Sequence, residues 1–127
     1  MTVTVVLDTT AVLAYTKGSI AMGELLSIIT DDGDSALIPA TCLAEAHRRV
    51  TGDVGALVSI LQAIPSVEMS PLLASQAAEV GAAARGRASI DASHAALEAV
   101  AREAQLVTQD VAIMSSLLPP DWPIVEI

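Results

Sequence analysis

The segment VVLDTTAVLAY, residues 5–15, sets the architecture of the chain because a single aspartate joins a strand-like run to a helical one. Residues 2–7 are largely β-branched or aliphatic and predict a strand, and residues 10–15 predict a helix. Asp8 stands at the junction, where two interpretations are open. It is either an N-cap that accepts the first free N–H groups of the helix, or a metal or catalytic carboxylate at the carboxyl end of a parallel strand.

The alternation of strand and helix continues to the end of the sequence. Further strands are predicted at residues 35–39, 66–70, 105–109 and 123–127, and further helices at residues 19–30, 40–50, 54–63, 71–84, 90–104 and 111–118. Ser70 and Pro71 are expected to be the N-cap and the first residue of the helix over 71–84. This order predicts one α/β domain over residues 1–127, with a mainly parallel central sheet flanked by α-helices.

Composition narrows the class of protein. Hydrophobic residues make up 53% of the 127 residues and charged residues 17%, so the chain is able to bury a core. The only cysteine, Cys42, excludes an internal disulfide and is expected to be a small core residue. No signal-like segment and no membrane-spanning apolar run is recognised, so a soluble cytoplasmic protein without membrane contact is expected. The net charge of −9 argues against broad non-specific binding of nucleic acid.

Four acidic residues stand apart from the others. Asp8 and Asp110 each follow a predicted strand, Asp91 begins a predicted helix, and Glu45 lies in the small, apolar stretch TCLAEA. If the two strands are neighbours, about 4.8 Å apart, Asp8 and Asp110 meet at one sheet edge. The helix after Asp91 rises roughly 22 Å and the next strand returns, which brings Asp91 to the same end.

Simpler interpretations of these acids are open too. Asp91 and Asp110 are also suited to be helix caps, and Glu45 is spaced to pair with Arg48 or Arg49 at i+3 and i+4. If the acids do converge, two carboxylates about 5 Å apart repel by roughly 3 kcal/mol at an effective dielectric near 20. A hard divalent cation such as Mg²⁺ or Mn²⁺ would relieve that repulsion. Two histidines and one cysteine at unrelated spacings form no zinc motif.

Four segments in this order resemble a PIN-domain ribonuclease of the VapC toxin type. They are VLDTTAVLAY at 6–15, IPATCLAEA at 38–46, IDASHAALEA at 90–99 and LVTQD at 106–110. The resemblance implies that one acidic quartet binds one or two Mg²⁺ or Mn²⁺ ions and cleaves RNA: Asp8, Glu45, Asp91 and Asp110. It implies that Thr10 and Thr108 support the first and last acids. It also implies a PIN-like parallel-sheet fold, a homodimer, and a small antitoxin as partner.

The basic residues gather near these acids in the sequence. The predicted phosphate contacts are Arg48, Arg49, Arg85 and Arg87. Ordinary pairing within one helix is an equally good interpretation of Arg48 and Arg49. His94, at i+3 from Asp91, is expected to be a packing or hydrogen-bonding residue rather than a substrate contact.

Two other classes of protein need residues that this sequence lacks. A haloacid-dehalogenase-like phosphatase requires a second aspartate two residues after Asp8, where Thr10 stands. A receiver-type phosphoacceptor requires a lysine after a late strand, and the only lysine is Lys17. The stronger alternative is a non-catalytic PIN-like protein-interaction module, which divalent ions would not stabilise.

Overall fold

The computed structural model describes residues 2–127, and within them strands and helices alternate as the sequence predicts. Two short 3₁₀ turns, Gly52–Val54 and Ala74–Gln76, precede α4 and α5. The elements in chain order are β1 (Val3–Leu7), α1 (Thr9–Thr16), α2 (Ile20–Asp31), β2 (Ser35–Pro39), α3 (Ala40–Arg49), α4 (Gly55–Ala63), β3 (Val67–Ser70), α5 (Ala77–Ala84), α6 (Ile90–Arg102), β4 (Gln105–Thr108), α7 (Val111–Leu117) and β5 (Ile124–Glu126).

The five strands form one sheet in the order β3-β2-β1-β4-β5, and every neighbouring pair is parallel. The predicted α/β class is therefore confirmed, with a wholly parallel sheet. In the central pair, Val6 of β1 is in register with Leu106 of β4. A register shift between Val3 and Val5 interrupts the pairing of β1 with β2.

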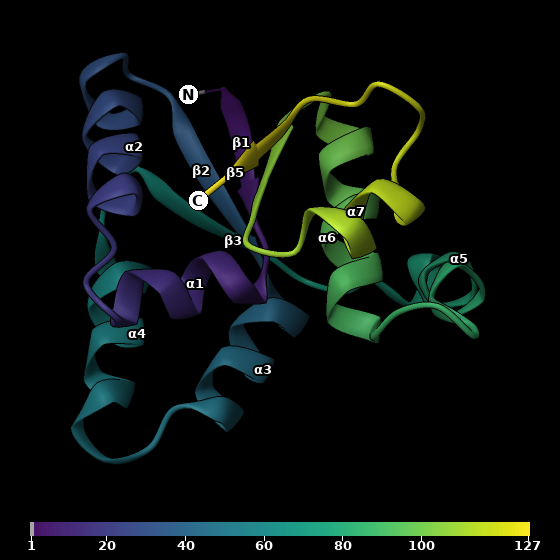
Figure 1. The fold of residues 1–127 in the computed structure, drawn as a ribbon, viewed down its shortest axis with the longest axis horizontal. Helices are drawn as coiled ribbons and strands as arrows, with labels where there is room; N and C mark the ends of the chain where they lie inside the picture. The colour runs from purple at the N-terminus through teal and green to yellow at the C-terminus, as the bar shows by residue number, and fades with distance from the viewer. Residues whose placement is uncertain (1) are drawn as a thin grey trace.

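The helices cover both faces of this sheet. Figure 1 shows α1, α2 and α4 on one side of the strands and α5, α6 and α7 on the other, with α3 beyond the ends of the strands between α4 and α6. The two sets follow from the path of the chain, which runs from β1 outward to β3, then returns across the sheet to β4. Right-handed crossovers in opposite directions place their helices on opposite faces.

Small and aliphatic side chains fill the core, as the near absence of aromatic residues requires. All five residues of β2 are buried, which is typical of a strand covered on both faces. Cys42 on α3 is fully buried among them, and burial raises the pKa of its thiol. These observations agree with its predicted place in the core.

One predicted helix boundary is wrong. Ser70 does not cap a helix, because it pairs with Pro39 in the ladder between β2 and β3. The chain stays extended as far as Leu73, whose backbone N–H donates to the Gln76 side chain at 2.9 Å. Helix α5 begins only at Ala77. Strand pairing therefore overrides the local helix-start signal of Ser70 and Pro71.

In residues 2–127 no single helix has the length and apolar character needed to cross a bilayer. Only α1 and α2 taken together pass on length and composition, and they are bent by 107° at their junction.

Candidate metal centre

The candidate centre lies where the strand order reverses. From β1 the chain moves to β2 on one side, and it later reaches β4 on the other. Asp8 follows β1, and its backbone N–H donates to the Val107 carbonyl of β4 at 3.3 Å. Open α/β sheets bind ligands at such a point, beyond the carboxyl ends of the strands.

Asp8 is both a helix cap and a lining residue of this site, so its two interpretations do not exclude each other. Its Oδ1 accepts hydrogen bonds from the Ala11 N–H at 2.9 Å and from the Thr10 hydroxyl at 2.7 Å. The residue is 4% exposed. Burial raises the pKa of Asp8, and hydrogen bonds from Thr108, Thr10 and Ala11 partly oppose that shift.

Two threonine hydroxyls connect the ends of β1 and β4. Thr10 Oγ1 lies 3.1 Å from Thr108 Oγ1 and accepts the Gln109 N–H at 2.8 Å. Thr108 Oγ1 accepts the Asp110 N–H at 2.9 Å. The supporting hydroxyls thus fix the backbone that carries both Asp8 and Asp110.

Asp91 and Asp110 approach the same place from other elements. Asp91, in the first turn of α6, is 9% exposed, and its Oδ2 accepts the Thr9 hydroxyl at 2.5 Å. Asp110 caps α7 by accepting the Ile113 N–H at 3.2 Å. Like Asp8, both accept hydrogen bonds from neutral donors, which fix a carboxylate without forming an ion pair with it.

A cavity of about 120 Å³ brings the three aspartates together. Its lining residues are Asp8, Thr9, Thr10, Arg49, Ser89, Asp91, Ala92, Asp110, Ile113 and Met114. The predicted meeting of Asp8, Asp91 and Asp110 at one end of the sheet is therefore confirmed. Among the residues that the structure describes, Arg49 is the only basic side chain on this wall.

Glu45 lies outside that cavity. It lines a shallower neighbouring hollow of about 310 Å³ that also contains Arg48 and Asp91. Its carboxylate accepts the Arg48 Nε at 2.9 Å and the Arg49 Nε at 3.0 Å. Hydrogen bonds from Arg48 and then Arg49 lower the pKa of Glu45 to about 2. The pairing of Glu45 with both arginines, left open by the sequence, is confirmed.

The donor chemistry of the cavity fits a hard cation, although the ligands are not preassembled. Between residues 2 and 127, no three His, Cys, Asp or Glu side chains form a group able to hold a metal ion. Mg²⁺, however, usually keeps several of its waters and is bound through one or two protein carboxylates. Two buried aspartates and one partly exposed aspartate, all lining one cavity, supply oxygen ligands of that kind.

The four arginines predicted to contact phosphate differ in their partners within the protein. Arg48 and Arg49 are both engaged with Glu45. Arg87 donates to the Ser116 carbonyl at 3.1 Å, which ties the loop before α6 to α7, and Arg85 is exposed on that loop. His94 is fully buried and bonded to Thr41, which agrees with its predicted packing role.

Sequence reasoning missed three polar side chains. Thr9 bonds Asp91, Ser89 lines the cavity as the N-cap of α6, and Thr41 lines the outer hollow. The doublet Thr9-Thr10 directly after Asp8 was a signal for the first of them. Thr41 carried none, because its importance depends on how α3 packs against α6.

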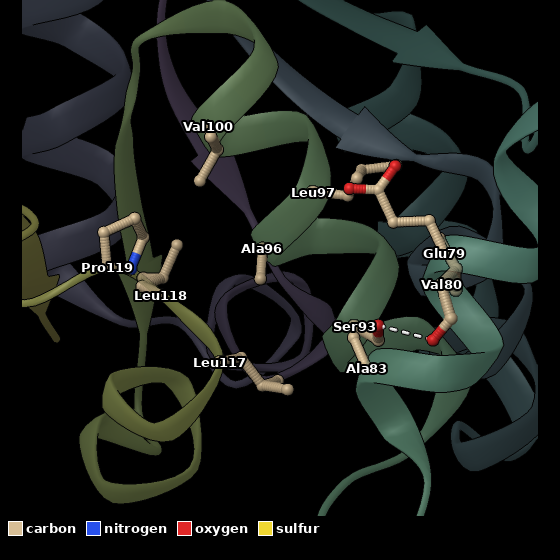
Figure 2. A pocket seen from close by; sticks show the side chains of 10 residues that line it. All are labelled: Glu79, Val80, Ala83, Ser93, Ala96, Leu97, Val100, Leu117, Leu118 and Pro119. Carbon is tan, nitrogen blue, oxygen red and sulfur yellow. Dashed lines mark hydrogen bonds between the residues drawn. The ribbon is translucent and has the colours of Figure 1, made fainter.

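A larger and mostly apolar hollow, about 350 Å³, lies away from the aspartates between α5, α6 and the end of α7. Figure 2 shows Leu117, Leu118 and Pro119 along one side of it and Glu79 and Val80 on the other. Its described lining contains no converging carboxylates and no basic groups, so the smaller cavity is the better candidate for chemistry.

Comparison with known proteins does not identify a family. No protein-family model matches the chain, and no curated protein is found that is significantly similar in sequence.

Proposed function

We propose that this chain is a Mg²⁺- or Mn²⁺-dependent endoribonuclease of the PIN-domain type. One observation carries the proposal: Asp8, Asp91 and Asp110, from three separate elements, line one cavity at the reversal of strand order. A buried site of that sign attracts a divalent cation. The resemblance of the four sequence segments to PIN-domain ribonucleases supplies the substrate class.

Asp8, Asp91 and Asp110 would hold the cation, with Glu45 as a fourth carboxylate at the edge. When bound, such a cation stabilises charge on a phosphate under attack and activates water. The protein contributes orientation, because Thr10 and the Ala11 N–H both donate to Oδ1 of Asp8, and Thr9 donates to Oδ2 of Asp91. The oxygens fixed in this way keep their orientation before substrate arrives, although the three carboxylates of the described chain are not preassembled around one point.

Glu45 also has a role that needs no direct contact with metal. By accepting from Arg48 and Arg49, it holds two guanidinium groups beside the cavity that Arg49 lines. Guanidinium groups are suited to phosphate oxygens. A chain with net charge −9 would thus approach an RNA backbone through a small basic rim.

The resemblance to PIN-domain ribonucleases also supports a proposal for the biological role of the chain. The chain would be the toxin of a type II toxin–antitoxin pair, inhibited by a small antitoxin and active as a homodimer. Light scattering of the purified chain tests the dimer, and a mass consistent with one copy would contradict it.

The nuclease is tested with antitoxin-free protein and single-stranded RNA, whose backbone is accessible. Cleavage is expected with Mn²⁺ and is expected to disappear with EDTA or in Asp8→Ala. Asp53→Ala is the matched control, because Asp53 is exposed and lies outside the cavity. Equal residual cleavage by wild type and Asp8→Ala across varied RNAs would contradict the proposal.

A non-catalytic interaction module is the second candidate. Two observations favour it: the described residues contain no ready-made metal group, and Glu45 is already neutralised by arginine. A module of this kind would show no thermal stabilisation by Mn²⁺ or Mg²⁺, whereas the nuclease would.

A further inference from the structure

A buried histidine reaches the outer hollow through one threonine. His94 on α6 has no exposed surface, and its Nδ1 lies 2.7 Å from the hydroxyl of Thr41 on α3. Thr41 is partly exposed and lines the hollow that also contains Glu45, Arg48 and Asp91. A group with no solvent contact therefore orients a hydroxyl beside the proposed centre.

The partners of the imidazole decide which way the hydroxyl points its proton. Glu98 Oε1 lies 3.5 Å from His94 Nε2, and a carboxylate oxygen is an acceptor. The distance to Glu98 is too long for a good hydrogen bond, but the carboxylate still favours a proton on Nε2. Glu98 itself is held by Gln76 at 3.4 Å and Arg102 at 3.5 Å.

A neutral imidazole has one N–H and one bare nitrogen. Burial lowers the pKa of His94, which favours this neutral form. With the proton on Nε2, the bare Nδ1 must accept, and Thr41 is the partner able to donate to it. The Thr41 hydroxyl proton is thereby committed to His94, and its oxygen lone pairs are left for the hollow.

We propose that Thr41 is a specificity residue that accepts a hydrogen bond from a ribose 2′-hydroxyl, and that His94 and Glu98 position it for this. The inference rests on the proposed function, because it concerns the RNA bound at that site. The 2′-hydroxyl is the group by which proteins distinguish RNA from DNA. A hydroxyl locked as an acceptor pairs with a ribose donor that DNA lacks.

The test compares Thr41→Val with Thr41→Ser. Binding is measured by fluorescence anisotropy, with Ca²⁺ in place of Mg²⁺, on a short mixed-sequence single-stranded RNA and on the same sequence with 2′-fluoro sugars. The 2′-fluoro group cannot donate a hydrogen bond. Thermal unfolding of each variant shows whether it is folded, since the valine leaves Nδ1 of His94 without its partner.

Wild type is expected to bind the RNA about three- to tenfold more tightly than the fluoro strand, the range of one net hydrogen bond. Thr41→Val is expected to bind both strands as wild type binds the fluoro strand, and Thr41→Ser is expected to keep the preference. A preference that survives in folded Thr41→Val, or an equal loss on both strands, would overturn the role of Thr41. Failure of wild type to bind or cleave any RNA would instead overturn the proposed function and this inference together.

Discussion

The aspartate cavity and the Glu45 hollow share Asp91, yet they hold their carboxylates in opposite ways. In the cavity, hydroxyl and backbone N–H donors hold the carboxylates, and burial raises the pKa of Asp8. In the hollow, two arginines hold Glu45 and lower its pKa to about 2. Neutral donors fix a carboxylate without cancelling its charge, whereas guanidinium groups cancel it. The cavity, although Arg49 lines it, is therefore the better suited of the two regions to bind a cation.

The largest effect expected from this difference is on cleavage. Asp91→Asn is expected to lower the rate of Mn²⁺-dependent RNA cleavage more than about a hundredfold, since even outer partners of metal ligands commonly cost 10- to 100-fold. Glu45→Gln is expected to cost about tenfold or less, because it loosens two arginines and removes a charge that is already paired. Single-turnover rates at saturating RNA measure both. Equal losses would mean that Glu45 binds the metal as closely as Asp91.

The second-largest expected effect is on the thermal stabilisation of the protein by a divalent cation, which should differ between variants of the two regions. A cation that binds only the folded chain stabilises it by about 2.7 kcal/mol at a free concentration of about 100 times Kd. This should raise the melting temperature of wild type by several degrees. Asp8→Asn, which keeps a good N-cap, is expected to lose that response, and Glu45→Gln to keep most of it. An unchanged response in Asp8→Asn would remove Asp8 from the site.

In EDTA, Asp8 and Glu45 are expected to affect the free energy of unfolding with opposite signs as pH changes. The folded state raises the pKa of Asp8 above its ordinary 3.8, so it binds this proton more tightly than the unfolded chain does. Asp8 then lowers stability increasingly as pH rises from 3.8 through its folded pKa. Asp8→Asn should therefore be stabilising at neutral pH, and the gain should fade as pH falls below 3.8.

Glu45 is expected to show the reverse. Its pKa is lowered from 4.5 to about 2, so its contribution to stability is complete above 4.5 and is lost as pH falls towards 2. Glu45→Gln should be mildly destabilising at neutral pH, and this loss should shrink in high salt because the pair is solvent-screened. Urea unfolding at several pH values measures both variants. If both substitutions changed the free energy of unfolding with the same sign at neutral pH, the proposed difference between the two regions would be contradicted.

The sequence was sufficient to predict the fold and the three aspartates that line the cavity. Strands of β-branched residues alternating with helices fix a parallel sheet, and parallel strands carry Asp8 and Asp110 to one edge regardless of packing detail. The state of Glu45 was not decidable, because its i+3 and i+4 arginines fit an ion pair and a metal-site rim equally well. Thr41 and the start of α5 depend on tertiary contacts, which local patterns do not contain.

The smallest expected effect is on the salt dependence of RNA binding, and it concerns Arg85. Arg85 is exposed on the loop between α5 and α6, so Arg85→Ala is expected to weaken RNA binding and to reduce the slope of log K against log salt by about one, as for one lost phosphate contact. Lys17→Ala is the control, because Lys17 is exposed and follows α1, nine residues beyond Asp8 and roughly 13 Å away along the helix axis. The metal response should be intact in both variants, since neither Arg85 nor Lys17 lines the aspartate cavity. Equal salt slopes for wild type and Arg85→Ala would place the RNA path elsewhere, along the arginines that Glu45 holds.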